Sequence, residues 1–168
     1  WKNSTLDNNI IFDTADFLVI NKPAGISVHP GAADYKYTVV NWLINRYGSK
    51  HSENFERKDR PGIVHRLDKM TSGCLMIAKN AKTLALAQTL LAQRKISRIY
   101  LAFVYGQFEQ AQLAGKITTR LIRDPFQRTR FQVTAGPNGR LAVTHYKVIE
   151  AFEEFSIVVF KLETGRTH

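Results

Sequence analysis

Four β-prone segments fill the second half of this sequence, and they constrain the fold more than any other feature. Each is rich in Val, Ile, Phe or Tyr, and they cover residues 99–105, 116–122, 142–152 and 155–162. Only Glu153 and Glu154 separate the last two, which predicts an antiparallel hairpin. The pattern indicates the α+β class, with a mixed, mainly antiparallel sheet and flanking helices, and it disfavours a doubly wound fold.

The first half of the sequence supplies the helices. Residues 38–48 predict a helix that begins at the N-cap Thr38 and ends at Gly48, and Asn80 is placed to cap a second helix over 81–95. Short strands are expected at 10–13, 17–21 and 75–79, and an exposed polar loop at 49–60. No repeat or flexible linker interrupts the chain, so we expect a single domain over residues 1–168.

Composition narrows the function. The 168 residues carry 24 Lys and Arg against 14 Asp and Glu, a net charge of +10, which favours a polyanionic partner such as nucleic acid. No apolar run approaches the ~20 residues that span a bilayer, so we expect no membrane association. The single cysteine, Cys74, excludes an internal disulfide, and with the polar N-terminus it favours the cytoplasm. The start at Trp1 predicts a chain trimmed from a longer one.

The densest polar cluster follows the Pro-Gly turn at 61–62. One acid, Asp68, lies there among the bases Arg60, Arg66 and Lys69, with His65 nearby. Rigid frames often hold catalytic groups on loops of this kind, and a carboxylate in positive surroundings stays ionised as a nucleophile or base. The same residues leave a structural alternative open, in which Asp68 accepts hydrogen bonds from turn amides.

Other chemistries find little support. Ser72 does not lie in a nucleophile elbow, which disfavours a His65–Asp68–Ser72 triad. The histidines lack metal-ligand spacing, so no metal site is expected, and His145 within a strand is interpreted as structural. No phosphate-binding glycine motif occurs. Strand alternation places Arg98 and Tyr100 on one face, where Tyr100 has two open roles, stacking on a nucleic-acid base or packing across strands.

The motifs, taken in order, resemble the RluA/RluD-type pseudouridine synthases. The most specific match is His-Arg-Leu-Asp at 65–68 followed by Thr-Ser-Gly at 71–73. The segments 21–25 with 28–31, 100–106 and 162–168 match three further family motifs, so the resemblance covers essentially the whole chain. The sequences His-Pro-Gly at 29–31 and Gly-Ile-Val-His-Arg-Leu-Asp at 62–68 are most similar to those of the RluD-type enzymes, which act on large-subunit ribosomal RNA.

The resemblance implies an isomerase that converts uridine in RNA to pseudouridine without cofactor or metal. Asp68 takes the place of the catalytic aspartate, and attack on C1′, attack on C6 and removal of a sugar proton all stay open for it. Tyr100 is expected to stack on the target base, Arg166 to pair with Asp68, and Arg66 to fill the space of the extruded uridine. His65, Lys22 and Arg98 complete the residues expected to contact RNA.

Two departures from the family pattern stand out. Arg98 replaces the usual Lys two residues before the tyrosine, which keeps the charge and is expected to preserve activity. The sequence ends at His168, where the family motif continues, and it lacks the small RNA-binding S4 domain. We therefore expect a C-terminally truncated catalytic domain and a monomer, and the activity of the truncated chain by itself stays open.

Three alternatives to a ribosomal RNA isomerase remain at this stage. The first is a catalytically silent RNA-binding module, and the second is a pseudouridine synthase that acts on transfer RNA. The third is a hydrolase that releases a base through Asp68. The sequence does not identify the target uridine.

Overall fold

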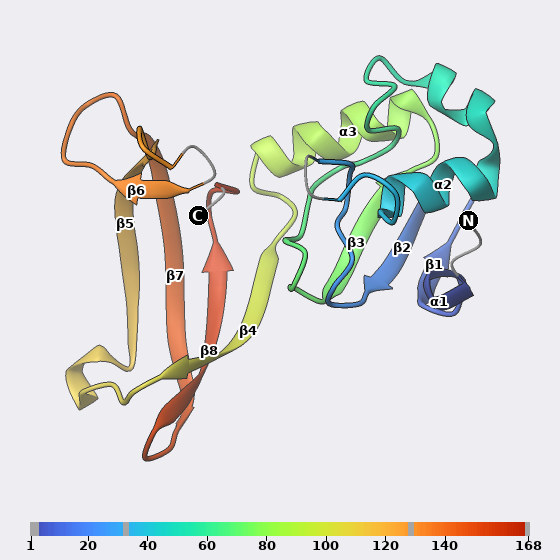
Figure 1. Cartoon of the computed structure of the whole chain (residues 1–168). Coiled ribbons are helices and arrows are strands. Elements are labelled where there is room, and N and C mark those ends of the chain that lie inside the picture. Colours follow the sequence, from blue (N-terminus) through green and yellow to red (C-terminus); the bar gives the residue numbers. More distant parts are fainter. Residues whose placement is uncertain (1–3, 32–33, 128–129, 167–168) are drawn as a thin grey trace. The chain divides into compact units, whose positions relative to one another are not determined.

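The chain folds into two compact units, Trp1–Gln93 and Arg94–His168 (Figure 1). The computed structural model describes residues 4–31, 34–127 and 130–166. Each unit has its own sheet, one of three strands and one of five. The α+β class predicted from the sequence is confirmed, and the expectation that residues 1–168 form a single catalytic domain stays a prediction. No helix within the described ranges is long and apolar enough to cross a membrane.

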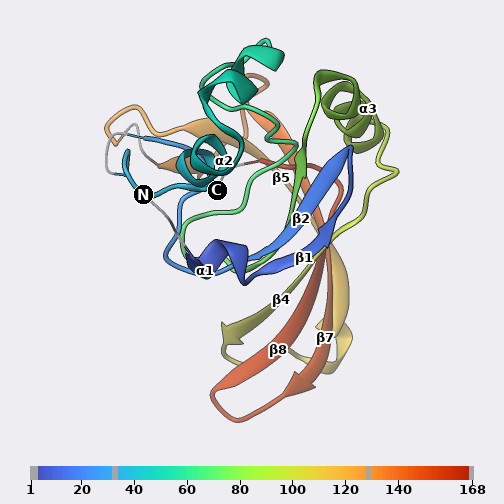
Figure 2. The ribbon, with the colours of Figure 1, turned by 90° about the vertical axis from the view of Figure 1, so that its right-hand side faces the viewer.

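The first unit is a three-stranded antiparallel sheet with helices. Its strands run in the order β1 (Ile10–Asp13), β2 (Phe17–Lys22) and β3 (Gly73–Ala78), and its helices are α1 (Ser4–Asp7), α2 (Val39–Tyr47) and α3 (Ala81–Ala92). α3 packs on one face through a cluster that joins Val64, Ala78 and Ala87. Figure 2 shows α2 and α3 on different sides of the sheet. The core also holds fully buried residues from β2, β3 and α2, namely Leu18, Ile20, Leu75, Ile77, Val39, Trp42 and Leu43.

The predicted helix starts are confirmed by their caps. The Thr38 hydroxyl accepts from the backbone N–H of Asn41, and the Asn41 side chain accepts from the N–H of Thr38, which forms a capping box. The helix ends at Gly48, whose φ of 82° lies in the left-handed region that glycine adopts without strain. Asn80 caps α3 through the N–H of Thr83, although α3 ends at Ala92, before the predicted end at 95.

The segment 49–60 is more ordered than the exposed loop that its polar composition predicted. Residues Ser49–Asn54 form the 3-10 helix η1, and the Phe55 side chain that follows is 2% exposed. The ring of His51 lies between Tyr47 and Phe55, with centroid distances of 5.0 and 5.2 Å. One apolar anchor therefore holds a polar segment against the unit, which composition alone does not show.

The second unit is an antiparallel sheet of five strands in the order β4-β8-β7-β5-β6. The strands are β4 (Arg98–Tyr105), β5 (Ala114–Arg123), β6 (Phe131–Val133), β7 (Arg140–Ala151) and β8 (Phe155–Leu162), with a short 3-10 helix, η2 (Gln110–Gln112), before β5. The predicted hairpin is confirmed, because Ala151 pairs with Ser156 across the 153–154 turn. Sequence patterning missed β6, which has three residues.

The two faces of β4 differ as the alternation predicted. Arg98, Tyr100, Ala102 and Val104 are all half-buried. The intervening side chains are apolar or aromatic yet exposed, from 63% for Ile99 to 97% for Tyr105. The face that carries Arg98 and Tyr100 is therefore the sheltered face of this strand.

Candidate active site

The loop that carries Asp68 is tied to β3 by its own start. Ile63 forms an isolated bridge with Ile77, and the carbonyl of Gly62 accepts from the N–H of Ala78 at 2.8 Å. Gly62 has a φ of 71°, and a Cβ at this position would lie 2.1 Å from the carbonyl oxygen of Ala78. Only glycine allows so close an approach of the two backbones, so Gly62 sets where the segment 63–68 begins.

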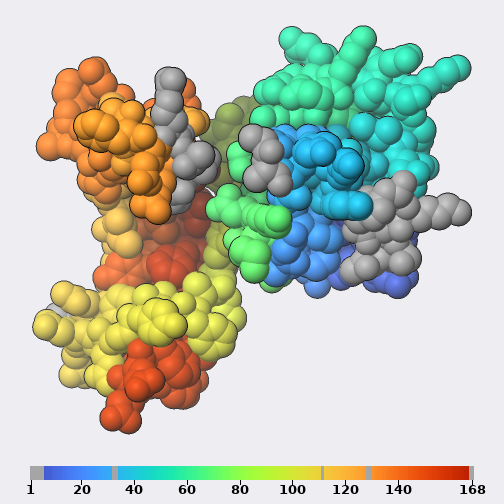
Figure 3. Space-filling view, viewed as in Figure 1, coloured from blue at the N-terminus to red at the C-terminus, as the bar shows by residue number. Residues whose placement is uncertain are grey.

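The far side of the loop is held by the segment after β2. The carbonyl oxygen of Lys69 accepts from the N–H of Gly25 at 2.8 Å and lies 3.2 Å from the Nζ of Lys22. The same ammonium donates to the carbonyls of Pro23 and Ile26. Figure 3 shows residues near 70, in bright green, at the surface beside the blue segment that follows β2. Asp68 thus lies on a loop that is fixed at both ends.

Lys22 is fully buried, although it was predicted to contact RNA. It lies on the same face of β2 as Leu18 and Ile20, which explains why its stem enters the core. Burial lowers the pKa of its ammonium group, and the Asp68 carboxylate opposes that shift. A side chain without exposed surface offers RNA no contact in this conformation, so its direct role here is to shape the loop.

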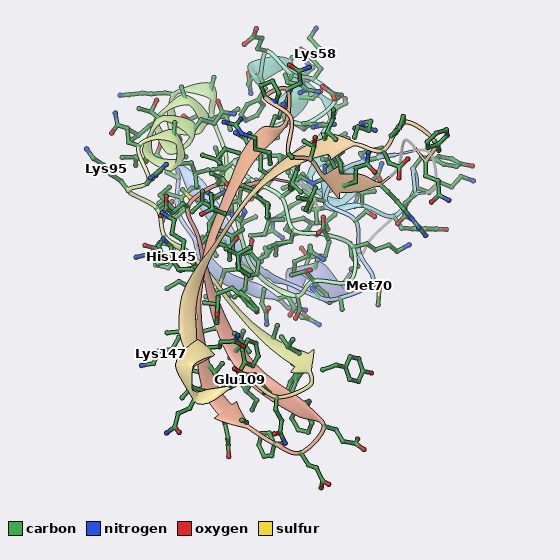
Figure 4. The ribbon with its side chains drawn as sticks, turned by 90° about the vertical axis from the view of Figure 1, so that its left-hand side faces the viewer. Lys58, Met70, Lys95, Glu109, His145 and Lys147 are labelled. Carbon is green, nitrogen blue, oxygen red and sulfur yellow. The ribbon has the colours of Figure 1, made fainter. Side chains whose placement is uncertain are left out.

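The Asp68 carboxylate faces solvent, and its side chain is 68% exposed. Its Oδ1 lies 3.9 Å from the Nη2 of Arg66, and the Arg66 side chain is 51% exposed. The backbone carbonyl of Asp68 accepts from the N–H of Thr71, but no backbone amide of a described residue donates to its carboxylate. The structural alternative, a carboxylate that caps turn amides, is therefore not what the structure shows. Met70, in the same loop, is also exposed (Figure 4).

His65 holds β3 from the same loop. Its Nε2 accepts from the backbone N–H of Met76 at 3.1 Å, which places the ring proton on Nδ1. The ring is half-buried, so part of it remains accessible. Its RNA contact stays a prediction.

In the second unit, Arg98 begins β4 and reaches the turn that follows β8. Its Nη2 lies 3.4 Å from the carbonyl oxygen of Glu163, and its Nη1 occupies the space where a Cβ on Gly165 would be, 2.1 Å away. Tyr100 follows on the same half-buried face and pairs with Phe160 of β8. The guanidinium of Arg98 therefore packs against the segment that carries Arg166, and Gly165 leaves the room for it.

The turn that carries Arg166 is bound to β7. The backbone N–H of Glu163 donates to the carbonyl of Val143, and the Thr164 hydroxyl accepts from the N–H of Val143. The Nε of Arg166 donates to the carbonyl of Leu141 at 3.1 Å, while its side chain stays at the surface. Thr167 and His168 of the same motif lie outside the described residues.

Glu163 anchors this turn through three basic side chains. Its carboxylate lies 2.5 Å from the Nε2 of His145, 2.9 Å from Arg94 and 3.6 Å from Lys116. The hydrogen bond with His145, followed by the charges of Lys116 and Arg94, lowers the pKa of the Glu163 carboxyl, although desolvation opposes the shift. The structural role predicted for His145 is confirmed by this contact. Sequence reasoning left the role of Glu163 open, because its partners come from three other segments.

The predicted site residues thus fall on both units. Arg66 and Asp68 come together in the first unit, with Lys22 behind them, while Arg98, Tyr100 and Arg166 belong to the second. The pairing of Asp68 with Arg166 joins one unit to the other and stays a prediction. The described residues contain no cluster of three or more metal-ligating side chains.

Comparison with known proteins places the chain in a family. Residues 16–168 match the model of the RNA pseudouridylate synthase family. The chain belongs to this family. The resemblance seen in the sequence is confirmed.

Similar synthases are found in several bacteria. The chain is 40% identical over 159 residues to the ribosomal large subunit pseudouridine synthase D of Borreliella burgdorferi, which covers 95% of the chain and 48% of that protein. It is 39% identical over 163 residues to an uncharacterized RNA pseudouridine synthase of Bacillus subtilis, covering 97% of the chain and 52% of that protein. The chain therefore spans about half the length of the curated relatives it matches.

Solved structures support the fold. The human RNA pseudouridylate synthase domain containing 4 superimposes with a TM-score of 0.72 at 22% identity, over 98% of this chain and 62% of that one. The human RNA pseudouridylate synthase domain containing 1 gives a TM-score of 0.70 at 24% identity, over 95% of this chain and 61% of that one. At these identities the likeness concerns the fold alone.

Proposed function

We propose that this synthase converts specific uridines of large-subunit ribosomal RNA to pseudouridine, with Asp68 as the catalytic carboxylate. Family membership and the names of relatives, such as the ribosomal large subunit pseudouridine synthase D of Borreliella burgdorferi, support the reaction and the substrate. The single observation that carries the proposal is the Asp68 carboxylate itself, which is exposed beside Arg66 on a loop fixed by Gly62 and Lys22.

The proposed reaction is an isomerisation. The C1′–N1 bond of uridine breaks, the base turns, and a C1′–C5 bond forms. The proton lost from C5 is balanced by the proton gained at N1, so neither a redox partner nor a second substrate is needed. Asp68 acts on the ribose or the base of the bound uridine, and attack on C1′, attack on C6 and removal of a sugar proton all satisfy this balance.

The other residues assist the reaction. Tyr100 stacks on the target base, and Arg166 pairs with Asp68 to keep the carboxylate charged. Arg66 fills the space that the extruded uridine leaves, which offsets part of the few kcal/mol that flipping costs. His65 and Arg98 contact RNA, and Lys22 acts on RNA binding through the loop that it supports.

The charge and the location of the protein follow the same proposal. A net charge of +10 favours binding to the phosphate backbone. The single cysteine suits a reducing compartment, so the proposal includes a cytoplasmic location. The proposal also takes the protein as a monomer.

Tritium release from RNA labelled at uridine C5 tests the proposal, because pseudouridine formation replaces that hydrogen. We would assay the chain and a C-terminally extended form, each also as Asp68→Asn, on ribosomal and transfer RNA. Release from ribosomal RNA that disappears with Asp68→Asn while RNA binding persists supports the proposed function. Release from transfer RNA alone overturns the substrate.

Two further outcomes identify the remaining alternatives. Free uracil in the products indicates a hydrolase, because an isomerase keeps the base attached to the RNA. RNA binding without release by the extended form, unchanged by Asp68→Asn, indicates a silent binding module.

A further inference from the structure

A cavity of about 330 Å³ lies in the first unit, beside the segment that leads to Asp68. Its walls come from three places: His29 after β2, the segment from Glu56 to Arg66, and α3 through Leu84. The volume is at the lower end of the range of small-ligand sites, about 300–1,000 Å³. The cavity reaches the site itself, because Arg66 lines it and also lies 3.9 Å from Asp68.

One side of the cavity is cationic. Arg57, Arg60 and Arg66 contribute three guanidinium groups to the lining, against the single carboxylate of Glu56. Asp59 orients two of them from outside the lining, with Oδ2 2.8 Å from the Nη2 of Arg57 and 3.4 Å from the Nε of Arg60. Guanidinium groups held in this way match the oxygens of a phosphate better than a lysine does.

The Nδ1 of the His29 ring is buried at this cavity, and no described residue forms a hydrogen bond with it. The Nε of Arg60 is also buried there, and its ion pair with the Oδ2 of Asp59 is long, at 3.4 Å. Burial, followed by the charges of Arg60 and Arg66, lowers the pKa of the His29 ring, and the Asp59 carboxylate opposes this shift. Buried polar atoms are normally paired, so a buried ring nitrogen without a partner among the described residues favours a polar ligand in the cavity.

The position of His29 is fixed by the backbone. The carbonyl of Val28 accepts from the N–H of Val40, and the carbonyl of Ser27 accepts from the N–H of Val39, at the start of α2. The two residues before His29 are thus held by hydrogen bonds from the first two residues of a capped helix. The cavity is a preformed feature of the first unit.

The opposite wall is apolar. Ile63 and Leu84 contribute to it, and Ile63 is fixed by its bridge to Ile77 of β3. A bare phosphate makes no use of such a wall, whereas the sugar or base attached to a phosphate does. The combination of arginines on one side and apolar surface on the other therefore favours a nucleotide over inorganic phosphate.

We propose that this cavity binds one nucleotide of the RNA substrate next to the target uridine, with its phosphate on Arg57, Arg60 and His29. The proposal rests on the proposed function, because it takes RNA as the ligand. It assigns a role to Arg57, Arg60 and His29 that the family motifs do not give them. A nucleotide held here, with Arg66 between it and Asp68, keeps the RNA in register while the neighbouring uridine is extruded.

The test is the affinity of the chain for a fluorescein-labelled fragment of large-subunit ribosomal RNA, measured by anisotropy over a series of salt concentrations. Arg60→Gln is expected to weaken binding about tenfold and to reduce the slope of log K against log salt by about 0.7–0.9, the value for one lost phosphate contact. Arg60→Lys is expected to restore the salt slope of the parent but only part of its affinity. It keeps the positive charge but loses the planar guanidinium that can bind two phosphate oxygens.

Lys58→Gln is the matched control. It removes one positive charge two residues away, from an exposed side chain outside the cavity lining (Figure 4). It is expected to leave the affinity and the salt slope close to those of the parent. Equal effects of Arg60→Gln and Lys58→Gln would overturn the proposal, since they would show only a loss of general charge. The fluorescence spectrum of each variant confirms that the buried Trp42 is undisturbed.

Competition distinguishes the ligand. Uridine monophosphate is expected to displace the RNA from the parent at a lower concentration than inorganic phosphate, and this advantage is expected to shrink in Arg60→Gln. Equal competition by the two anions in the parent would mean a phosphate-only site and would reject the nucleotide. If tritium release is absent but the Arg60 effects persist, the proposed isomerase activity is rejected and nucleotide binding in the cavity is supported. If release depends on Asp68 but Arg60→Gln binds RNA like the parent, nucleotide binding in the cavity is rejected and the proposed isomerase activity is supported.

Discussion

The buried ammonium nitrogen of Lys22 lies 3.2 Å from the carbonyl oxygen of Lys69, the residue after Asp68. The two lysines are 47 positions apart in the sequence. Through this contact, the segment 21–25 fixes the loop that bears the proposed catalytic carboxylate. The segment 21–25 thus supports the Asp68 loop from its buried side.

Replacing Lys22 tests that support. Lys22→Met fills the same volume but removes the ammonium that donates to the carbonyls of Pro23, Ile26 and Lys69. The Lys69 carbonyl keeps the N–H of Gly25 as a donor, and the loss at the other two carbonyls is expected to cost about 1–3 kcal/mol of the free energy of unfolding. Urea unfolding followed by Trp42 fluorescence, in a Trp1→Phe background that leaves a single tryptophan, measures it in the first unit. Lys82→Met, at an exposed position of α3, is the control and is expected to change stability by less than about 0.5 kcal/mol. Equal stability of the two variants would contradict the supporting role.

Alanine substitutions at Gly62 and Gly25 distinguish the cost of a steric clash from the cost of backbone strain. Both have φ in the left-handed region, but a Cβ at Gly25 meets nothing within 4 Å, while one at Gly62 lies 2.1 Å from the Ala78 carbonyl oxygen. Gly25→Ala is therefore expected to cost about 1–2 kcal/mol, the strain of the conformation alone. Gly62→Ala is expected to cost clearly more, because the 62–78 backbone contact must open. The same fluorescence assay compares the free energies of unfolding of the two variants. Similar losses of stability would show that the backbone contact between Gly62 and Ala78 can open at little cost.

The sequence predicted much of this site because its chemistry is local. Asp68 and Arg66 lie two residues apart, and the strand that carries Arg98 and Tyr100 follows from simple alternation. Lys22 was assigned to RNA through the family resemblance, yet its register with Leu18 and Ile20 already indicated the buried face. The contacts of Gly62 with Ala78 and of Glu163 with His145 join distant segments, and one sequence contains no signal that pairs them. Phe55, which orders the segment 49–60, was hidden by the polar residues around it.

Acid pH is expected to weaken the turn that Glu163 anchors. Its carboxyl has a pKa below the ordinary value of 4.5 in the folded chain, with His145 as the first cause. The unfolded chain binds a proton there first, so the stabilisation is complete above pH 4.5 and is lost as the pH falls through the folded pKa. Glu163→Gln is therefore expected to be less stable than the parent at pH 5, with a smaller difference at pH 3. Urea midpoints from circular dichroism measure this.

The control for this pH effect is Glu109→Gln. Glu109 is exposed and forms no ion pair with a described residue, so its replacement is expected to leave a small difference that does not change between pH 5 and pH 3 (Figure 4). A pH-independent loss in Glu163→Gln would contradict the electrostatic explanation and would assign the effect to packing.

The contact of Arg98 with Gly165 predicts a coupling between two substitutions. A methyl group at Gly165 would lie 2.1 Å from the Nη1 of Arg98, so Gly165→Ala displaces the guanidinium and disturbs the turn that carries Arg166. We expect the rate of tritium release by the C-terminally extended form to fall about tenfold or more, with little loss of stability, because the end of a flexible side chain can move. Arg98→Lys alone, which restores the residue usual in the family, is expected to keep most of the activity.

The double variant decides between a specific contact and general damage. A lysine ammonium is smaller than the guanidinium fork and leaves room for the methyl, so Arg98→Lys with Gly165→Ala is expected to recover much of the rate lost in Gly165→Ala. Gly136→Ala, whose Cβ would lie 3.4 Å from the Thr134 hydroxyl oxygen, is a control expected to be nearly silent. Additive losses in the double variant would show that Arg98 does not position the turn, because residues in contact are expected to couple and independent ones to add.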